Sequence, residues 1–162
     1  MEKISVFTAA AMAAAAPAIL ASCSGTGDEY PEPEPMPSGE PTAEELVEFT
    51  ALSLPDDLEN LNIERSRNET GGLVYIATFS TSPQGAEMFC ELGENFSAYR
   101  SPDPPEDPKW ITQDFPEDTV DGYTTCTGSN LQEDSVARRA LITFPDEDSA
   151  EVILEAERLN TR

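Results

Sequence analysis

Carboxylates are the most abundant groups in this sequence that could do chemistry, and they gather in two places. One cluster consists of Asp114, Glu117, Asp118 and Asp121, and the other is the run of residues 146–148. A pair of carboxylates is the minimum requirement of a glycoside hydrolase, and carboxylate oxygens are ligands that calcium prefers. The second run lacks the glycine and the spacing of an EF-hand loop, and the dipole of a following helix would also favour it. A small carboxylate-dependent hydrolase and a calcium-binding envelope module therefore stand as alternatives to a domain without catalysis.

The overall charge and the lack of histidine narrow the chemistry further. The 162 residues include 32 acidic and 9 basic side chains, and the formal net charge is -23. Such a chain repels phosphate backbones, so nucleic acid is not expected as a partner. The sequence has no histidine, which excludes a Ser-His or Cys-His nucleophile and the usual histidine ligands of zinc. We expect no cofactor and no metal, and a non-catalytic domain is favoured over an enzyme.

The acidic surplus itself has two interpretations. Charge runs are usually solvated surface, and attraction to cations or to a basic protein is the alternative. The basic residues concentrate in two pairs, Arg65 with Arg67 and Arg138 with Arg139. Alternate residues of a strand share a face, so Arg65 and Arg67 could together bind a carboxylate. Ion pairing with neighbouring acids is the simpler interpretation.

The three cysteines are expected to have two different roles, one for Cys23 and another for the remaining two. Cys23 follows shortly after residues 4–21, an uncharged and alanine-rich stretch that comes after a short charged start. Such a stretch is typical of an export signal. Once Cys23 is set apart, Cys90 and Cys126 remain as an even pair. Outside the cytoplasm such a pair is expected to form a disulfide, with two free buried thiols as the alternative.

The residues Leu20-Ala21-Ser22-Cys23 resemble the lipobox of bacterial lipoproteins. The resemblance implies that Cys23 carries a diacylglyceryl group and becomes the first residue after removal of a signal peptide, residues 1–22. Two or three acyl chains anchor a protein stably, because each buried methylene contributes roughly 0.8 kcal/mol. An uncleaved membrane-spanning helix and an ordinary secretory signal are the alternatives.

The same resemblance implies a location and a set of partners. The protein is expected at the outer face of the cytoplasmic membrane, in contact with the lipid bilayer through acylated Cys23. A protein of the cell envelope is a second candidate partner. The remainder of the chain resembles small bacterial lipoproteins as a class, which predicts a place in the cell but no particular activity.

The chain after Cys23 divides into a tether and a domain. Residues 23–41 are rich in Pro, Glu, Gly and Ser and are predicted to be a disordered tether. Residues 42–162 are predicted to form a single globular domain. At its start, Thr42-Ala43-Glu44-Glu45 has the form of a capping box and predicts a short helix, which should end before Pro55.

The remaining elements predict an α+β fold. Residues 61–68 and 73–81 predict a β-hairpin, and residues 82–93 predict a helix. Residues 122–127 and 136–144 predict two further strands. A final helix is predicted from the spacing of its apolar residues, Ala150, Val152, Ile153, Ala156 and Leu159. Two strand-strand-helix units would then give a four-stranded, largely antiparallel sheet with two helices on one face, preceded by the short helix.

Overall fold

The computed structural model describes residues 35–91, 93, 95–105, 119–130 and 135–159, all within the unit Glu32–Arg162. The elements follow one another as α1 (Ala43–Thr50), β1 (Glu59–Arg67), β2 (Leu73–Thr81), α2 (Pro83–Glu91), β3 (Phe96–Ser101), β4 (Tyr123–Asn130), β5 (Val136–Thr143) and β6 (Ala150–Arg158). Neither helix has the length and apolar character needed to cross a membrane within this described part. The predicted signal peptide and residues 23–34 of the predicted tether lie outside the described residues.

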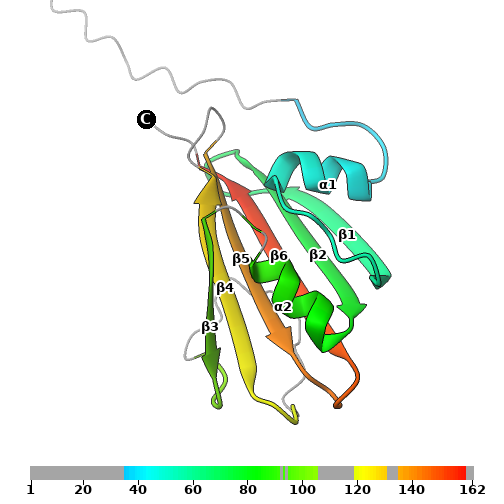
Figure 1. The fold of residues 1–162 in the computed structure, drawn as a ribbon. Coiled ribbons are helices and arrows are strands. Elements are labelled where there is room, and N and C mark those ends of the chain that lie inside the picture. The colour runs from blue at the N-terminus through cyan, green and yellow to red at the C-terminus, as the bar shows by residue number, and fades with distance from the viewer. Residues whose placement is uncertain (1–34, 92, 94, 106–118, 131–134, 160–162) are drawn as a thin grey trace, which may run out of the picture. The chain divides into compact units, whose positions relative to one another are not determined.

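The strands of the described part form one antiparallel sheet of six, in the order β1-β2-β6-β5-β4-β3. The β1–β2 hairpin lies at one edge, and the chain passes through α2 to β3 at the opposite edge (Figure 1). It then returns strand by strand until β6 pairs with β2. Both helices pack on one face of this sheet (Figure 1), where their apolar side chains join the core.

The predicted architecture of a four-stranded sheet built from two strand-strand-helix units is therefore wrong. The structure has a six-stranded sheet, and residues 150–158 form the strand β6 between β2 and β5 in place of a helix. A further strand, β3, occupies residues 96–101, where no strand was predicted. Most elements of the described residues are strands, and these residues do not form the two strand-strand-helix units that were expected.

The sequence of β6 explains this difference. Ala150, Val152, Leu154 and Ala156 are buried and alternate with Glu151, Ile153, Glu155 and Glu157. An alternation with a period of two is typical of a strand. Several of the same apolar residues also fit helical spacing, which led to the wrong prediction. The strand prevails because β6 pairs along both of its edges, and in this central position even Ile153 on the second face is buried.

The predictions for the first half of the domain are confirmed in their main features. The hairpin forms, and β2 has the predicted bounds of residues 73–81. The amide of Glu45 donates to Oγ1 of Thr42 at 3.2 Å, so Thr42 caps α1 as expected. The helix ends at Thr50, and Ala51 adopts a left-handed conformation with φ 52°. It therefore ends by its own C-cap, several residues before Pro55.

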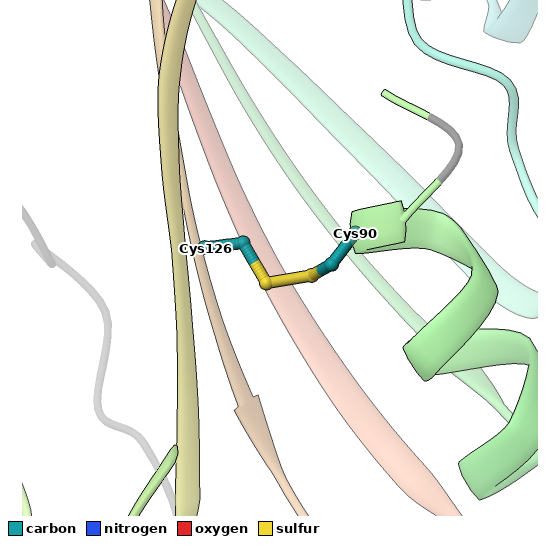
Figure 2. Close-up of a disulfide and its surroundings, with 2 residues drawn as sticks. All are labelled: Cys90 and Cys126. Atoms are coloured by element: carbon teal, nitrogen blue, oxygen red, sulfur yellow. A yellow bond between two sulfur atoms is a disulfide. The ribbon is translucent and has the colours of Figure 1, made fainter. Parts of the chain in front are cut away.

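The core lies between the helices and the sheet. Phe89 of α2 is at its centre and makes edge contacts with Phe79 and Phe96, with ring centroids 5.4 and 5.9 Å apart. A disulfide joins Cys90 of α2 to Cys126 of β4, and both residues are buried (Figure 2). This covalent bond fastens the helix to a strand that is 36 residues away in sequence.

Candidate functional site

The carboxylate clusters of the sequence do not form a site in the described part of the chain. Asp114, Glu117 and Asp118 lie outside the described residues, and their neighbour Asp121 forms an exposed ion pair with Arg100. Among the described residues, no group of three or more acidic or cysteine side chains converges as metal ligands would. The predicted lipid attachment residue, Cys23, also lies outside the described residues.

The acidic run at residues 146–148 stabilises a turn. The amide of Asp148 donates to Oδ1 of Asp146 at 2.9 Å. Hydrogen bonds from the Ser149 side chain, first, and from the Asp148 amide hold the pKa of Asp146 below its ordinary value. The carboxylate of Asp146 therefore closes the connection between β5 and β6, in place of the helix start that was expected there.

Of the two arginine pairs of the sequence, Arg138 and Arg139 are divided between the two faces of the sheet. Arg65 of β1 lies opposite Tyr75 of β2, and both lie on the face that carries the helices. Arg138 of β5 lies in the same row, opposite Ala156 of β6. Its neighbour Arg139 is on the other face, 3.9 Å from a carboxylate oxygen of Glu155. Adjacent arginines of one strand therefore serve different surfaces.

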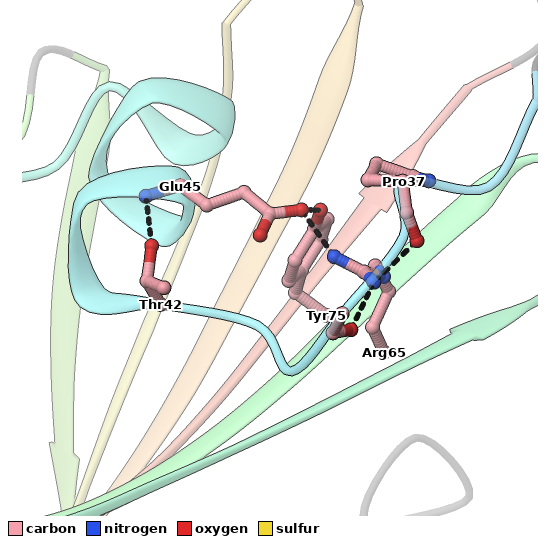
Figure 3. Close-up of polar contacts among 6 residues, drawn as sticks. Pro37, Thr42, Glu45, Arg65 and Tyr75 are labelled. Atoms are coloured by element: carbon pink, nitrogen blue, oxygen red, sulfur yellow. Dashed lines mark hydrogen bonds and ion pairs between the residues drawn. The ribbon is translucent and has the colours of Figure 1, made fainter.

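Arg65 binds carboxylate, but the carboxylate belongs to this chain (Figure 3). Its guanidinium pairs with Glu45 of α1 and donates to the carbonyl oxygens of Pro37 and Gly39 at 2.6 and 2.9 Å. The hydroxyl of Tyr75 donates to the same carboxylate. The side chain of Arg65 is only 5% exposed. The interpretation of Arg65 as an ion-paired residue is confirmed, and the carboxylate that it binds is Glu45.

The protonation equilibria of this cluster follow from its contacts. The Tyr75 hydroxyl, first, and Arg65 lower the pKa of Glu45. Burial, first, and the Glu45 carboxylate raise the pKa of Tyr75. Each shift favours an ionised Glu45 beside a neutral Tyr75, which is the combination that the hydrogen bond between them requires. The cluster therefore holds α1 and residues 37–39 against the hairpin.

Arg138 holds the other end of the same helix. It is 1% exposed, its Nη1 donates to the carbonyl oxygen of Thr50 at 2.9 Å, and its guanidinium lies 5.5 Å from the centre of the Phe96 ring. A cation near the C-terminus of a helix is favoured by the helix dipole. Glu45 and Arg138 thus fix the two ends of α1 to the sheet.

A cleft of about 380 Å³ opens at the end of the hairpin that is remote from its turn. One wall is the loop after α1, and the other is formed by Ser82 and α2. The lining residues are Ser53, Leu54, Pro55, Asp56, Asp57, Ser82, Gln84, Gly85, Met88 and Phe89. A volume of this size is within the range of sites for small ligands, roughly 300 to 1,000 Å³.

Asp57 joins the two walls of the cleft. Its Oδ1 accepts a hydrogen bond from Oγ1 of Thr81 at 2.5 Å, and its Oδ2 accepts one from the amide of Ser82 at 3.1 Å. Hydrogen bonds from Ser82, first, and Thr81 lower the pKa of Asp57 to about 2. The carboxylate is therefore ionised at any physiological pH, and it neutralises part of the positive end of the α2 dipole.

Gly85 allows this close approach of the two walls. A Cβ atom at position 85 would lie 2.6 Å from Oδ1 of Asp57, so no other residue fits without displacing the carboxylate. The Ser82 hydroxyl accepts a hydrogen bond from the amide of Gly85 at 3.1 Å and caps the helix. The geometry of the cleft thus depends on a small residue in the first turn of α2.

The sequence did not point to this cleft. Leu54, Pro55, Asp56 and Asp57 were interpreted only as the end of the first helix. Asp57 lies 24 residues before Thr81, and no local pattern links a carboxylate to a hydroxyl over that separation. The one local signal was Ser82 before Pro83, which is typical of a helix start. That signal located α2 but not the acid that binds to its N-terminus.

Comparisons with family models, with curated proteins and with solved structures find no match to this chain.

Proposed function

We propose that this protein is a bacterial lipoprotein, held at the outer face of the cytoplasmic membrane by acylated Cys23, whose domain binds a partner without catalysis. The observation that carries the proposal is the run Leu20-Ala21-Ser22-Cys23 at the end of an uncharged stretch, because a lipobox places its cysteine at that point. The bilayer is the first partner, and a protein of the cell envelope is the second.

The buried disulfide between Cys90 and Cys126 supports an extracytoplasmic location. Disulfides persist in oxidising compartments and are rare where thiols are kept reduced. The proline-rich segment between Cys23 and the domain supports a tether, since alternating proline favours an extended chain of about 3.1 Å per residue. Signal, cysteine, spacer and oxidised domain are therefore mutually consistent.

The cleft between the α1–β1 loop and α2 is the candidate binding site of the domain. Its chemistry favours binding over hydrolysis. A general acid among paired carboxylates needs a raised pKa, whereas the pKa of Asp57 is lowered to about 2 by hydrogen bonds that are already made. Asp57 therefore acts as a fixed negative charge that does not exchange protons near neutral pH.

Metabolic labelling tests the lipid anchor. The full chain is expressed in a bacterium that is supplied with an alkyne analogue of palmitate, and the purified chain is coupled to a fluorophore. The wild type is expected to carry label, and Cys23→Ala to carry none. Ser22→Ala is the matched control, because it keeps a small residue before the cysteine and should label like the wild type. An unlabelled wild type, or a labelled Cys23→Ala, would overturn the proposal.

A further inference from the structure

We propose that the cleft between the α1–β1 loop and α2 binds a basic side chain of a protein partner, an aliphatic stem that ends in an ammonium or guanidinium group. This inference rests on the proposed function, because it names the chemistry of the partner that the tethered domain would bind. It depends on three properties of the described cleft: its unpaired negative charge, its apolar wall and its size.

The negative charge of the cleft is not matched by a cation of the described part of the chain. Its lining includes Asp56 and Asp57 and no lysine or arginine. The ion pairs that the structure gives for the described residues lie elsewhere, and they join Arg65 to Glu45, Arg100 to Asp121, and Arg139 to Glu155 and Glu157. An incoming cation would therefore meet two carboxylates that no arginine among the described residues neutralises.

The carboxylates of Asp56 and Asp57 have different roles in the cleft. Asp57 already accepts hydrogen bonds from Thr81 and Ser82 and compensates the N-terminus of α2. Asp56 is exposed on the same wall, and among the described residues the structure gives its carboxylate no corresponding hydrogen bonds. We therefore assign the direct contact with the cation to Asp56. Asp57 keeps the wall in place and adds to the negative potential.

The apolar part of the cleft suits the stem of a lysine or arginine. Leu54 and Pro55 line one wall, Met88 lines the other, and buried Phe89 is also part of the lining. Met88 is 47% exposed, and a flexible thioether adapts to ligands of different shape. Long basic side chains bury their methylene stems on apolar surface while the charged group reaches a polar one. A cation without a stem would leave this wall uncovered.

The charge of the whole chain favours the same class of partner. A formal net charge of -23 attracts a basic polypeptide at long range and repels an acidic one. This attraction is screened beyond about 8 Å at physiological ionic strength. Long-range attraction and binding in the cleft can therefore be separated by adding salt and by removing one charge near the cleft or far from it.

The test is a titration of the full chain with three blocked tripeptides, Gly-Xaa-Gly, at 0.15 M salt. Xaa is lysine, norleucine, which has a similar stem without charge, or diaminopropionic acid, which has the charge on a short stem. The methionine methyl groups are labelled with ¹³C. Met88 in the cleft reports binding, and exposed Met36 outside the cleft lining is the internal reference. We expect the lysine peptide to shift Met88 and not Met36, and the other two peptides to bind at least fivefold more weakly.

Two substitutions with the same loss of charge complete the test. Asp56→Asn should weaken the lysine peptide about fivefold, the upper end for an exposed ion pair. Glu69→Gln is the matched control in the β1–β2 turn, at the other end of the hairpin, and should change affinity less than twofold. Equal effects of the two substitutions would overturn the proposal in favour of general electrostatic attraction. Equal binding of norleucine, or no shift of Met88, would also overturn it.

The outcome is independent of the lipid anchor. A chain that labels with palmitate but does not bind the lysine peptide would overturn the assigned partner chemistry and leave the anchor intact. A chain that binds the peptide but carries no lipid would overturn the anchor and leave the cleft assignment intact.

Discussion

Glu45 of α1 and Arg65 of β1 form an ion pair that joins the first helix to the edge strand of the sheet. Tyr75 donates a hydrogen bond to the same carboxylate from the neighbouring strand β2. The guanidinium of Arg65 also binds the carbonyl oxygens of Pro37 and Gly39. One arginine therefore connects the residues before α1, the helix and the hairpin, and it determines how the chain enters the domain.

This ion pair predicts a pH-dependent contribution to stability. The pKa of Glu45 is lowered from its ordinary value of 4.5, so the folded state favours the ionised form. Its contribution is complete above pH 4.5 and is lost as the pH falls through the lowered pKa. We expect Glu45→Gln to reduce the melting temperature at pH 7 and to reduce it less at a pH below the lowered pKa. Glu44→Gln, one residue earlier in α1, is the control. Equal reductions at both pH values would contradict this role of Glu45.

The same contacts predict a local effect of Arg65. Arg65→Ala removes the cation that binds Glu45 and the two carbonyl groups. Amide hydrogen exchange should accelerate in α1, while β5 and β6, which pair with each other in the middle of the sheet, keep their protection. Exchange measured by mass spectrometry gives the comparison. Unchanged protection of α1 would contradict this role of Arg65.

The assignment of residues 150–158 to a strand predicts that truncating one leucine destabilises the fold strongly and that truncating another does so only slightly. Leu154 is fully buried, whereas Leu159 is 40% exposed. If residues 150–158 form a strand, Leu154→Ala should lower the free energy of unfolding by about 2 to 5 kcal/mol. Leu159→Ala should cost about 0.5 kcal/mol or less. The helix that the apolar spacing predicted would place Leu159 on the buried face, so a larger cost for Leu159→Ala would contradict the strand. Denaturant unfolding measures both.

The disulfide predicts a large difference between oxidised and reduced protein. Cys90 and Cys126 enclose a loop with a sequence separation of 36. Closing such a loop lowers the entropy of the unfolded chain and should stabilise the fold by about 4 kcal/mol. The double variant Cys90→Ser and Cys126→Ser should lose this amount in denaturant unfolding. If the double variant and the wild type unfold at the same denaturant concentration, the bond does not stabilise the domain.

The hydrogen bonds of Asp57 predict a second loss of stability, at a lower pH than that of Glu45. Its pKa of about 2 lies below the ordinary 3.8 because it accepts hydrogen bonds from Ser82 and Thr81. The stabilisation is complete above about pH 3.8 and is lost as the pH falls toward 2. A carboxyl titration followed by NMR should give a midpoint near 2 in the wild type. Thr81→Val removes one donor and should move the midpoint toward 3.8. A wild-type midpoint near 3.8 would contradict the hydrogen bonds.

Local signals predicted the first half of the fold well. Thr42 is followed by Glu45 at the spacing of a cap, and residues 73–81 combine β-branched and aromatic side chains between turn residues. Each signal acts within a few residues, and the structure keeps each element. They were sufficient because the helix cap and the strand propensity agree with the tertiary contacts that these elements make.

The second half and the cleft depended on contacts that are distant in sequence. Val152, Ile153 and Leu154 fit either a helix or a strand, and pairing with β2 and β5 decides between them. The strand β3 is short, and most of its residues are exposed, so its pattern carries little signal. Asp57 gains its role from Thr81 and Ser82, which no pattern around Asp57 indicates. The predicted fold therefore differs from the observed one where contacts between residues distant in sequence decide the structure.

The central proposal concerns the state of Cys23, and the intact mass of the native chain tests it most directly. The full-length gene is expressed in a bacterium, and the membrane fraction is analysed by mass spectrometry. We predict a chain that begins at Cys23, without residues 1–22, with a diacylglyceryl group on the cysteine sulfur. A chain that still begins at Met1, or a shortened chain with an unmodified Cys23, would contradict the proposal.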